Sequence, residues 1–172
     1  MSRDASALPI DLPAELLRAC YADAERNYPH EACGLLSGPA GCAAVDALRI
    51  CENDQDRLHG SDPAAYPETA RTAYRLRFVD VRWLIESLPS AQPVKVIYHS
   101  HVEVGPEFSR ADQQAALHEG RPIYPVAHLV IAVGGRGVFG AKLYGFVGHG
   151  FACWAEFDDQ GQRFLDLVQN RV

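Results

Sequence analysis

The sequence predicts a mixed α/β (α+β) fold in which helices flank a β-sheet of mixed strand direction. Three observations lead to this prediction. Short runs rich in β-branched and aromatic residues recur along the chain and are bounded by glycine and proline, as strands are. Other segments carry apolar residues at helical spacing. The chain has 172 residues, 48% of them hydrophobic, and no repeat interrupts it, so residues 1–172 are expected to form a single domain with one core.

The first predicted element is a helix that begins after Pro13 and ends near Asn27. Its apolar stripe, at positions i, i+3, i+4 and i+7, consists of Leu17, Cys20, Tyr21 and Ala24. Short strands are predicted over 32–36 and 43–50, separated by a Gly-Pro-Ala-Gly turn. The polar segment 52–71 contains a glycine and two prolines and is expected to be a loop, whose unusual length is typical of functional loops.

The second half of the chain is predicted to contain both strands and helices. A strand is expected over 73–78, and Asp80 is expected to cap a helix that Pro89 stops. The residues at core spacing in that helix are Val81, Leu84, Ile85 and Leu88. The remaining predicted elements are a strand over 93–98, a hairpin of 127–133 with 137–146, a strand over 151–157 and a terminal helix that carries Phe164, Leu165 and Val168.

The most informative stretch of the chain follows the strand predicted over 93–98. It begins with the sequence His-Ser-His, in which His99 and His101 flank Ser100. Alternate side chains of a strand point to the same face of the sheet. His99 and His101 are therefore expected to project together, while Ser100 points away, so that two imidazole nitrogens can reach a single ion.

A hydroxyl and a carboxylate complete the pattern, which reads H-x-H-x7-S-x-x-D. A turn at Gly105-Pro106 is followed by Ser109 and then by residues that favour a helix. That helix would place Asp112 in its first turn, where the carboxylate can face the end of the strand. Two imidazoles and a carboxylate suit a catalytic zinc ion, which keeps three protein ligands and an open position for water.

Each part of this pattern has a simpler explanation when it stands alone. Ser109 and Asp112 have the spacing of a helix cap, in which a serine and an acid three residues later satisfy unpaired backbone amides. Histidines are often partly buried without binding metal. Glu31, in a Pro-His-Glu-Ala-Cys-Gly turn, is on its own an exposed acid. Found together, these groups are hard to explain by packing, and they predict a metal site with Glu31 as the base.

The combined pattern resembles that of the JAMM metallopeptidase family, also called the JAB1/MPN/Mov34 domain. The family pattern is an upstream glutamate followed by H-x-H-x7-S-x-x-D, and it is matched by Glu31, His99, His101, Ser109 and Asp112. The resemblance covers about residues 8–145, and the segment around the glutamate is similar to the compact prokaryotic members. Many members have proline after the second histidine, where this chain has Val102. That departure affects the loop and the fit of the substrate rather than the metal ligands.

The resemblance implies a JAB/MPN-like fold and a zinc-dependent peptidase or isopeptidase. The substrate would be a ubiquitin-like or sulfur-carrier protein that is cleaved after its C-terminal Gly-Gly. His99, His101 and Asp112 would hold one Zn²⁺. Glu31 would take a proton from water and pass it to the leaving amine, and Ser109 would donate its hydroxyl to the developing oxyanion. The leaving group stays open between a cysteine, another amino acid and a lysine side chain, and so does the oligomeric state.

Two other functions remain open at this stage. A zinc hydrolase of a small-molecule amide would use the same site, because fold and site do not dictate the substrate. A non-catalytic MPN-type binding scaffold is the other alternative, since several relatives of the family have lost their metal ligands. All of the ligands are present in this chain, which favours an enzyme over a scaffold.

Composition indicates which binding partners and which cellular compartment are expected for the protein. With 16 basic and 22 acidic residues the net charge is −6, and no basic run indicates binding to nucleic acid. No apolar stretch approaches the ~18 residues that would span a membrane, and the N-terminus lacks the long apolar segment of a secretion signal. The chain has five cysteines with no C-x-x-C pair. Reduced thiols in the cytoplasm fit this usage best.

Overall fold

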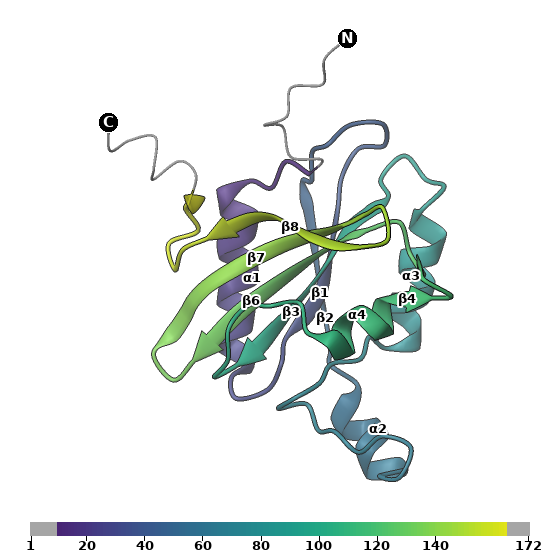
Figure 1. Ribbon diagram of the computed structural model, residues 1–172, viewed down its shortest axis with the longest axis vertical. Helices are drawn as coiled ribbons and strands as arrows, with labels where there is room; N and C mark the ends of the chain where they lie inside the picture. The colour runs from purple at the N-terminus through teal and green to yellow at the C-terminus, as the bar shows by residue number, and fades with distance from the viewer. Residues whose placement is uncertain (1–9, 165–172) are drawn as a thin grey trace.

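The computed structural model describes residues 10–164, which form a six-stranded mixed sheet and a separate two-stranded hairpin (Figure 1). The helices are α1 (Ala14–Asn27), α2 (Gln55–Ser61), α3 (Phe78–Ser87) and α4 (Arg110–Ala116). The strands of the large sheet are β1 (Cys33–Ser37), β2 (Ala47–Cys51), β3 (Val94–Val102), β6 (Ala127–Gly134), β7 (Gly137–Val147) and β8 (Gly150–Phe157). The hairpin consists of β4 (Leu117–His118) and β5 (Arg121–Pro122).

The sheet has the strand order β2-β1-β3-β6-β7-β8. The central pair, β3 with β6, is parallel, and the other neighbours are antiparallel. In the β1–β3 pair, Cys33 lies opposite His99. The strand that carries both histidines of the motif is therefore central in the sheet, with hydrogen-bonded strands on both sides.

Alternation along β3 divides the core between the two faces of the sheet. Val96 and Tyr98 pack with residues of α1 such as Leu17 in one cluster. Ile97 points the other way and packs in a second cluster with Leu84 of α3. Because α1 and α3 cover opposite faces, both histidines, which share the face of Ile97, project to the side of the sheet that carries α3.

Most of the predicted elements are present. The helix at Ala14–Asn27, the helix that follows Ser109, the β6–β7 hairpin and the strand at Gly150–Phe157 agree with the prediction to within one or two residues. The strand predicted over 93–98 runs on through the motif and ends at Val102. The pair predicted over 32–36 and 43–50 is observed as β1 and β2, with β2 beginning four residues late. A mixed sheet flanked by helices is thus the observed fold.

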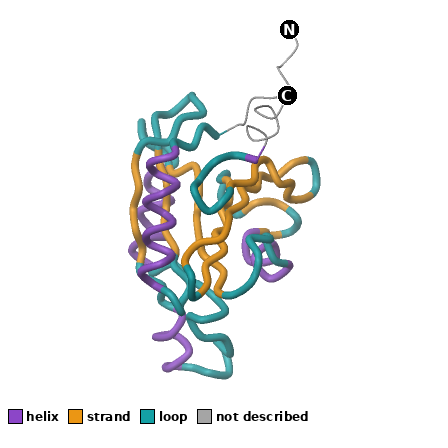
Figure 2. The backbone as a smooth tube through the Cα atoms, turned by 90° about the vertical axis from the view of Figure 1, so that its left-hand side faces the viewer, coloured by secondary structure: helices purple, strands orange, loops and turns teal. Residues whose placement is uncertain are grey.

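The prediction of a loop over 52–71 is wrong in part, because α2 lies within it. This helix has no apolar stripe, and Gln55 is its buried residue. It is held instead by contacts distant in sequence, since Gln55 Nε2 donates to Glu68 O (2.7 Å) and Ala70 N donates to Asp56 Oδ1 (2.7 Å). These contacts cannot be read from local periodicity. Figures 1 and 2 both show α2 projecting beyond the end of the sheet.

Two further expectations are wrong around α3. Residues 73–78 do not form a strand, since their one bridge joins Leu76 to Asn53. Asp80 does not cap the helix, which begins at Phe78 after Arg77. Asp80 lies in the first turn and its carboxylate accepts a hydrogen bond from Arg49 Nε (2.9 Å), so it links α3 to β2 instead.

The remaining expectations concern the ends of the chain and its cysteines. The predicted terminal helix lies outside the described residues, apart from Phe164. All five cysteines are free thiols. Within residues 10–164, none of the helices has the length and hydrophobicity needed to cross a bilayer.

Candidate metal centre

The register of β1 against β3 explains how Glu31 comes close to the histidines. Beyond the last residue pair of the ladder the two segments stay bonded, because Ser100 N donates to Ala32 O (2.9 Å) and Ala32 N donates to Ser100 Oγ (2.7 Å). One residue farther along each segment, this register sets Glu31 against His101, with both side chains on the same face. Two segments that are distant in sequence are thus aligned by strand pairing.

The structure brings His99, His101 and Asp112 together. The Nε2 atoms of the two histidines are 3.1 Å apart, and Asp112 Oδ2 lies 3.2 Å from His101 Nε2 and 3.5 Å from His99 Nε2. The His99 side chain is fully buried, whereas those of His101 and Asp112 are 10% and 16% exposed. Solvent therefore reaches the cluster from the side of Asp112 and His101.

Asp112 is held in place by the start of α4. Ser109 is the N-cap residue, and its Oγ accepts from Asp112 N (3.1 Å) while Ser109 N donates to Asp112 Oδ2 (2.9 Å). This reciprocal pair is a capping box. The cap and the metal-site interpretations of these residues are therefore both compatible with the structure, because the box directs the carboxylate of Asp112 toward the histidines.

The spacing of the three side chains fits a metal ion. Ligand atoms placed tetrahedrally at about 2.0–2.1 Å from one zinc ion are about 3.3 Å from one another, and the observed separations are 3.1–3.5 Å. In neutral His101, Nδ1–H donates to Gly105 O (3.1 Å), which leaves the lone pair on Nε2. That lone pair faces another imidazole and a carboxylate, so a cation satisfies the cluster better than hydrogen bonds alone.

The pKa values of Asp112, His101 and His99 are shifted by burial and by the hydrogen bonds within the cluster. Burial opposes ionisation of Asp112, but hydrogen bonds from His101 and His99 outweigh it and hold the pKa of the carboxyl well below its usual range. Burial also opposes the charge on His101, yet its bonds to Asp112 and Gly105 O raise its pKa. For the fully buried His99, burial is the larger effect and its pKa is lowered. Asp112 is thus ionised and His99 neutral, the forms that bind metal, whereas His101 would have to give up its proton on Nε2 to the incoming ion.

The pKa of Glu31 is shifted upward, in the opposite direction to that of Asp112. Burial raises its pKa to about 8, with the negative charge of Asp112 adding to the effect and the positive charge of His101 opposing it. The backbone of Glu31 is fixed, because its N–H donates to Ala70 O (2.6 Å) and its carbonyl accepts from Asn53 Nδ2 (2.9 Å). The carboxyl group itself makes no hydrogen bond to the residues that the structure describes. It is therefore a buried acid whose side chain is left for other contacts.

Aromatic residues that the sequence did not single out surround the cluster. The ring of Tyr74 stacks on His99 with centroids 4.4 Å apart, and Phe108 lies 6.4 Å from His99 on another side. Phe108 also stacks on His128 (4.7 Å), which is buried and has an Nδ1 without a hydrogen-bond partner. The sequence carries no local signal for these contacts, since Tyr74 and His128 come from segments distant from the motif.

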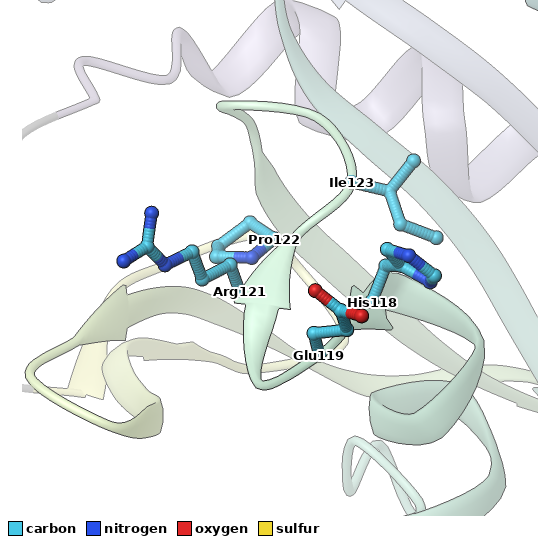
Figure 3. A pocket seen from close by; sticks show the side chains of 5 residues that line it. All are labelled: His118, Glu119, Arg121, Pro122 and Ile123. Atoms are coloured by element: carbon cyan, nitrogen blue, oxygen red, sulfur yellow. The ribbon is translucent and has the colours of Figure 1, made fainter.

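A surface hollow lies along the β4–β5 hairpin, which follows α4 in the chain. It is lined by His118, Glu119, Arg121, Pro122 and Ile123, and Figure 3 shows Arg121 and Ile123 extending to opposite sides of the hairpin. None of these five residues is one of the predicted site residues. The hollow therefore shares no lining residue with the group formed by His99, His101 and Asp112.

Comparison with known proteins identifies the class to which this fold and site belong. Residues 13–142 match the family model of prokaryotic homologs of the JAB domain. The chain therefore belongs to this family of JAB domain homologs. Among curated proteins, it is similar to the CysO-cysteine peptidases of Mycobacterium tuberculosis and Mycobacterium bovis. The identity is 33% over 119 residues, which cover 69% of this chain and 68% of each relative.

Two solved structures resemble the chain to different degrees, and the first of them supports the fold. The solution structure of a protein from Desulfitobacterium hafniense has a TM-score of 0.55 at 16% identity and covers 81% of this chain and 85% of its own. A JAB1/MPN domain protein from Archaeoglobus fulgidus has a TM-score of 0.41 at 16% identity, covering 90% of this chain and 92% of its own. The predicted resemblance to the JAB/MPN family is confirmed by the match of residues 13–142 to the model of prokaryotic JAB domain homologs.

Proposed function

We propose that this protein is a zinc-dependent peptidase that hydrolyses the bond after the C-terminal glycine of a small sulfur-carrier protein of the ubiquitin-like kind. The observation that carries the proposal is the convergence of His99, His101 and Asp112 at separations of 3.1–3.5 Å, with a buried acid, Glu31, in register beside them. Two histidines, one carboxylate and access from one side are the arrangement of a catalytic zinc site.

In this proposal each polar residue has a distinct role. His99, His101 and Asp112 hold the ion, and Gly105 O orients the ring of His101. When bound, zinc supplies a Lewis acid and a water whose pKa is near 7. Glu31 accepts the proton of the attacking water and delivers it to the leaving amine, a contribution of typically ~10²–10⁴-fold. Burial raises its pKa to about 8 in the metal-free protein, so its carboxylate is a stronger base than a solvated glutamate, which favours the first half of that transfer.

Ser109 is the proposed donor to the oxyanion. In this structure its hydroxyl donates to Asp112 Oδ2 (2.6 Å) and its oxygen accepts from Asp112 N (3.1 Å). The role therefore requires the hydroxyl proton to turn from the carboxylate to the substrate, while the oxygen keeps its place in the capping box. One donor of this kind contributes about 10²–10³-fold to the rate.

The substrate class comes from the relatives. The similar mycobacterial proteins are CysO-cysteine peptidases, a name that pairs a carrier protein with a cysteine. By analogy, we propose a carrier protein extended past its terminal Gly-Gly as the substrate and an amino acid such as cysteine as the leaving group. The soluble, reduced setting expected from the sequence, a cytoplasm, suits a chain with five free thiols.

The proposal is tested with a sulfur-carrier protein that carries one cysteine after its terminal Gly-Gly. The zinc-loaded wild type should remove the cysteine, and mass spectrometry should find a product that ends in glycine. Glu31→Gln should keep its zinc but lose roughly 10²–10⁴-fold in kcat. Glu86→Gln is the matched control, because Glu86 pairs with Arg82 on the surface of α3. No cleavage by the wild type would contradict the proposed function, and normal cleavage by Glu31→Gln would contradict the role of the base.

A further inference from the structure

A glutamate at the end of β3 has an unusual backbone conformation. Glu103 has a φ of +61°, in the left-handed region that residues other than glycine rarely occupy. Its carboxylate is engaged, since Oε1 accepts from Tyr28 Oη (2.6 Å) and from Gly135 N (3.0 Å). Its own N–H donates to Val133 O (2.9 Å). A strained residue that is held by several bonds points to a function for that residue.

The β6–β7 turn is shaped to receive this carboxylate. A Cβ added to Gly134 would lie 3.1 Å from Glu103 Oε2, closer than most side chains tolerate. The next residue, Gly135, supplies the N–H that binds Oε1. The turn therefore accommodates Glu103 in two ways: the missing side chain of Gly134 permits the close approach, and the backbone of Gly135 supplies the donor.

The contact between Tyr28, Glu103 and Gly135 joins the segments that carry the proposed catalytic groups. Glu103 follows the ligand His101 by two residues, and Tyr28 precedes the proposed base Glu31 by three residues. Strand pairing between these segments ends at Ala32 and its bonds to Ser100. Beyond that point the Tyr28–Glu103 hydrogen bond is the next direct link between them among the described residues.

We propose that Glu103 and Tyr28 form a clamp that positions Glu31 relative to the metal-binding histidines. The inference rests on the proposed peptidase function and adds positioning residues to it. Neither Tyr28 nor Glu103 touches the ligand cluster in the described contacts, so the clamp acts through the backbone of residues 28–31 and 101–103.

The expected effect is on the rate rather than on metal binding. A displacement of about 1 Å at a catalytic group can cost up to ~10²-fold, and a loosened clamp should cost less, about 5–20-fold in kcat. Zinc content and KM should stay within about twofold of wild type, because the ligands are held by β3 and by the capping box of α4.

Three variants test the clamp on the zinc-loaded, full-length protein. Tyr28→Phe removes the hydroxyl alone. Glu103→Gly removes the carboxylate but suits a φ of +61°, so the thermal stability should be unchanged or higher while kcat falls. Glu103→Gln retains an oxygen acceptor and should restore most of the activity. Tyr21→Phe is the matched control, since Tyr21 lies in α1, which Tyr28 directly follows, and the substitution likewise removes a tyrosine hydrogen bond, to Asp158 O (2.9 Å).

The double variant Tyr28→Phe/Glu103→Gly decides whether the two residues act as a unit. Its kcat should be no lower than that of the worse single variant, whereas independent contributions would multiply. Normal kcat in both single variants would overturn the clamp. Hydrogen exchange gives a readout without activity: in Tyr28→Phe the amides of Glu31 and Ala32 should exchange several-fold faster than in the wild type, and an unchanged rate would overturn the clamp even if no carrier protein is cleaved.

Discussion

Strand β3 presents buried polar side chains to both faces of the sheet. The side chains on one face have hydrogen-bond partners within the fold, whereas those on the other face lack some of them. On the face that α1 covers, Tyr98 Oη donates to Asp23 Oδ2 (2.8 Å) and Ser100 Oγ accepts from Ala32 N (2.7 Å). On the opposite face, His99 and His101 direct their Nε2 atoms toward each other at 3.1 Å, and His99 Nδ1 has no hydrogen-bond partner.

The same contrast separates two buried acids, Asp23 and Glu31. Asp23 is fully buried, and its carboxylate accepts from Arg26 (2.7 Å), Asn27 (3.0 Å) and Tyr98 (2.8 Å). Glu31 is 5% exposed, and its carboxyl group has no such donor among residues 10–164. Buried polar groups are normally hydrogen-bonded, so the unpartnered Nδ1 of His99, beside a Glu31 carboxyl group that no protein donor occupies, marks this face as the one that can take a ligand.

The largest expected effect comes from Asp112→Asn. This substitution keeps the size of the side chain and an oxygen that can accept from Ser109 N, but it removes the negative charge from the proposed ligand set. Zinc affinity should fall by more than about 100-fold, since losing a group that merely orients a ligand already costs 10–100-fold. Metal analysis after dialysis against a weak chelator measures the loss, and cleavage of the extended carrier protein should fall with it.

Two controls belong to this experiment. Chelation of the wild type should abolish cleavage, and added Zn²⁺ should restore it. Full metal content in Asp112→Asn would show that the three side chains do not form a metal site, and so would cleavage that survives chelation. Neither face of β3 would then be a ligand site.

The part of the site that follows from local rules could be predicted from the sequence. The two-residue period of a strand puts His99 and His101 on one face, and the capping box places Asp112 in the first turn of α4. The core stripe of α1 was predicted for the same reason, because Leu17, Cys20, Tyr21 and Ala24 recur at helical spacing and are all buried.

What the sequence did not predict depends on contacts between distant segments. Glu31 was predicted to be the base from its residue type together with the downstream motif, but its position opposite His101 results from the β1–β3 register. The helix α2 is held by bonds such as Gln55 Nε2 to Glu68 O, and its own sequence has no apolar period. The left-handed conformation of Glu103 depends on the turn that it contacts, since glutamate has no intrinsic preference for it.

The buried acid Glu31 predicts a dependence of stability on pH. Its pKa is raised from 4.5 to about 8 in the folded protein, chiefly by burial, so folding favours the protonated form. Its contribution to stability is therefore fully present below about pH 4.5 and is lost as the pH rises through about 8. In metal-free protein the loss should reach a few kcal/mol, because one unit of pKa shift corresponds to about 1.4 kcal/mol.

Urea unfolding of the wild type and Glu31→Gln, both with chelator, isolates this contribution, since other titrating groups are common to the two proteins. The free energy of unfolding of the wild type relative to the variant should decrease from about pH 5 to about pH 8.5. A difference that is constant with pH would mean that Glu31 is solvated in the absence of metal and that burial does not raise its pKa.

The smallest expected effect comes from Asp23→Asn, the same chemical change as Asp112→Asn on the opposite face. It removes charge from a carboxylate that three side chains already satisfy, so it should lower the free energy of unfolding by about 1–3 kcal/mol. Zinc content and kcat should remain within about twofold of wild type, because the partners of Asp23 belong to α1 and to the far side of β3. Loss of zinc comparable to that in Asp112→Asn would contradict this expectation. It would mean that the two faces are coupled through β3 and that Asp23 contributes to the metal site.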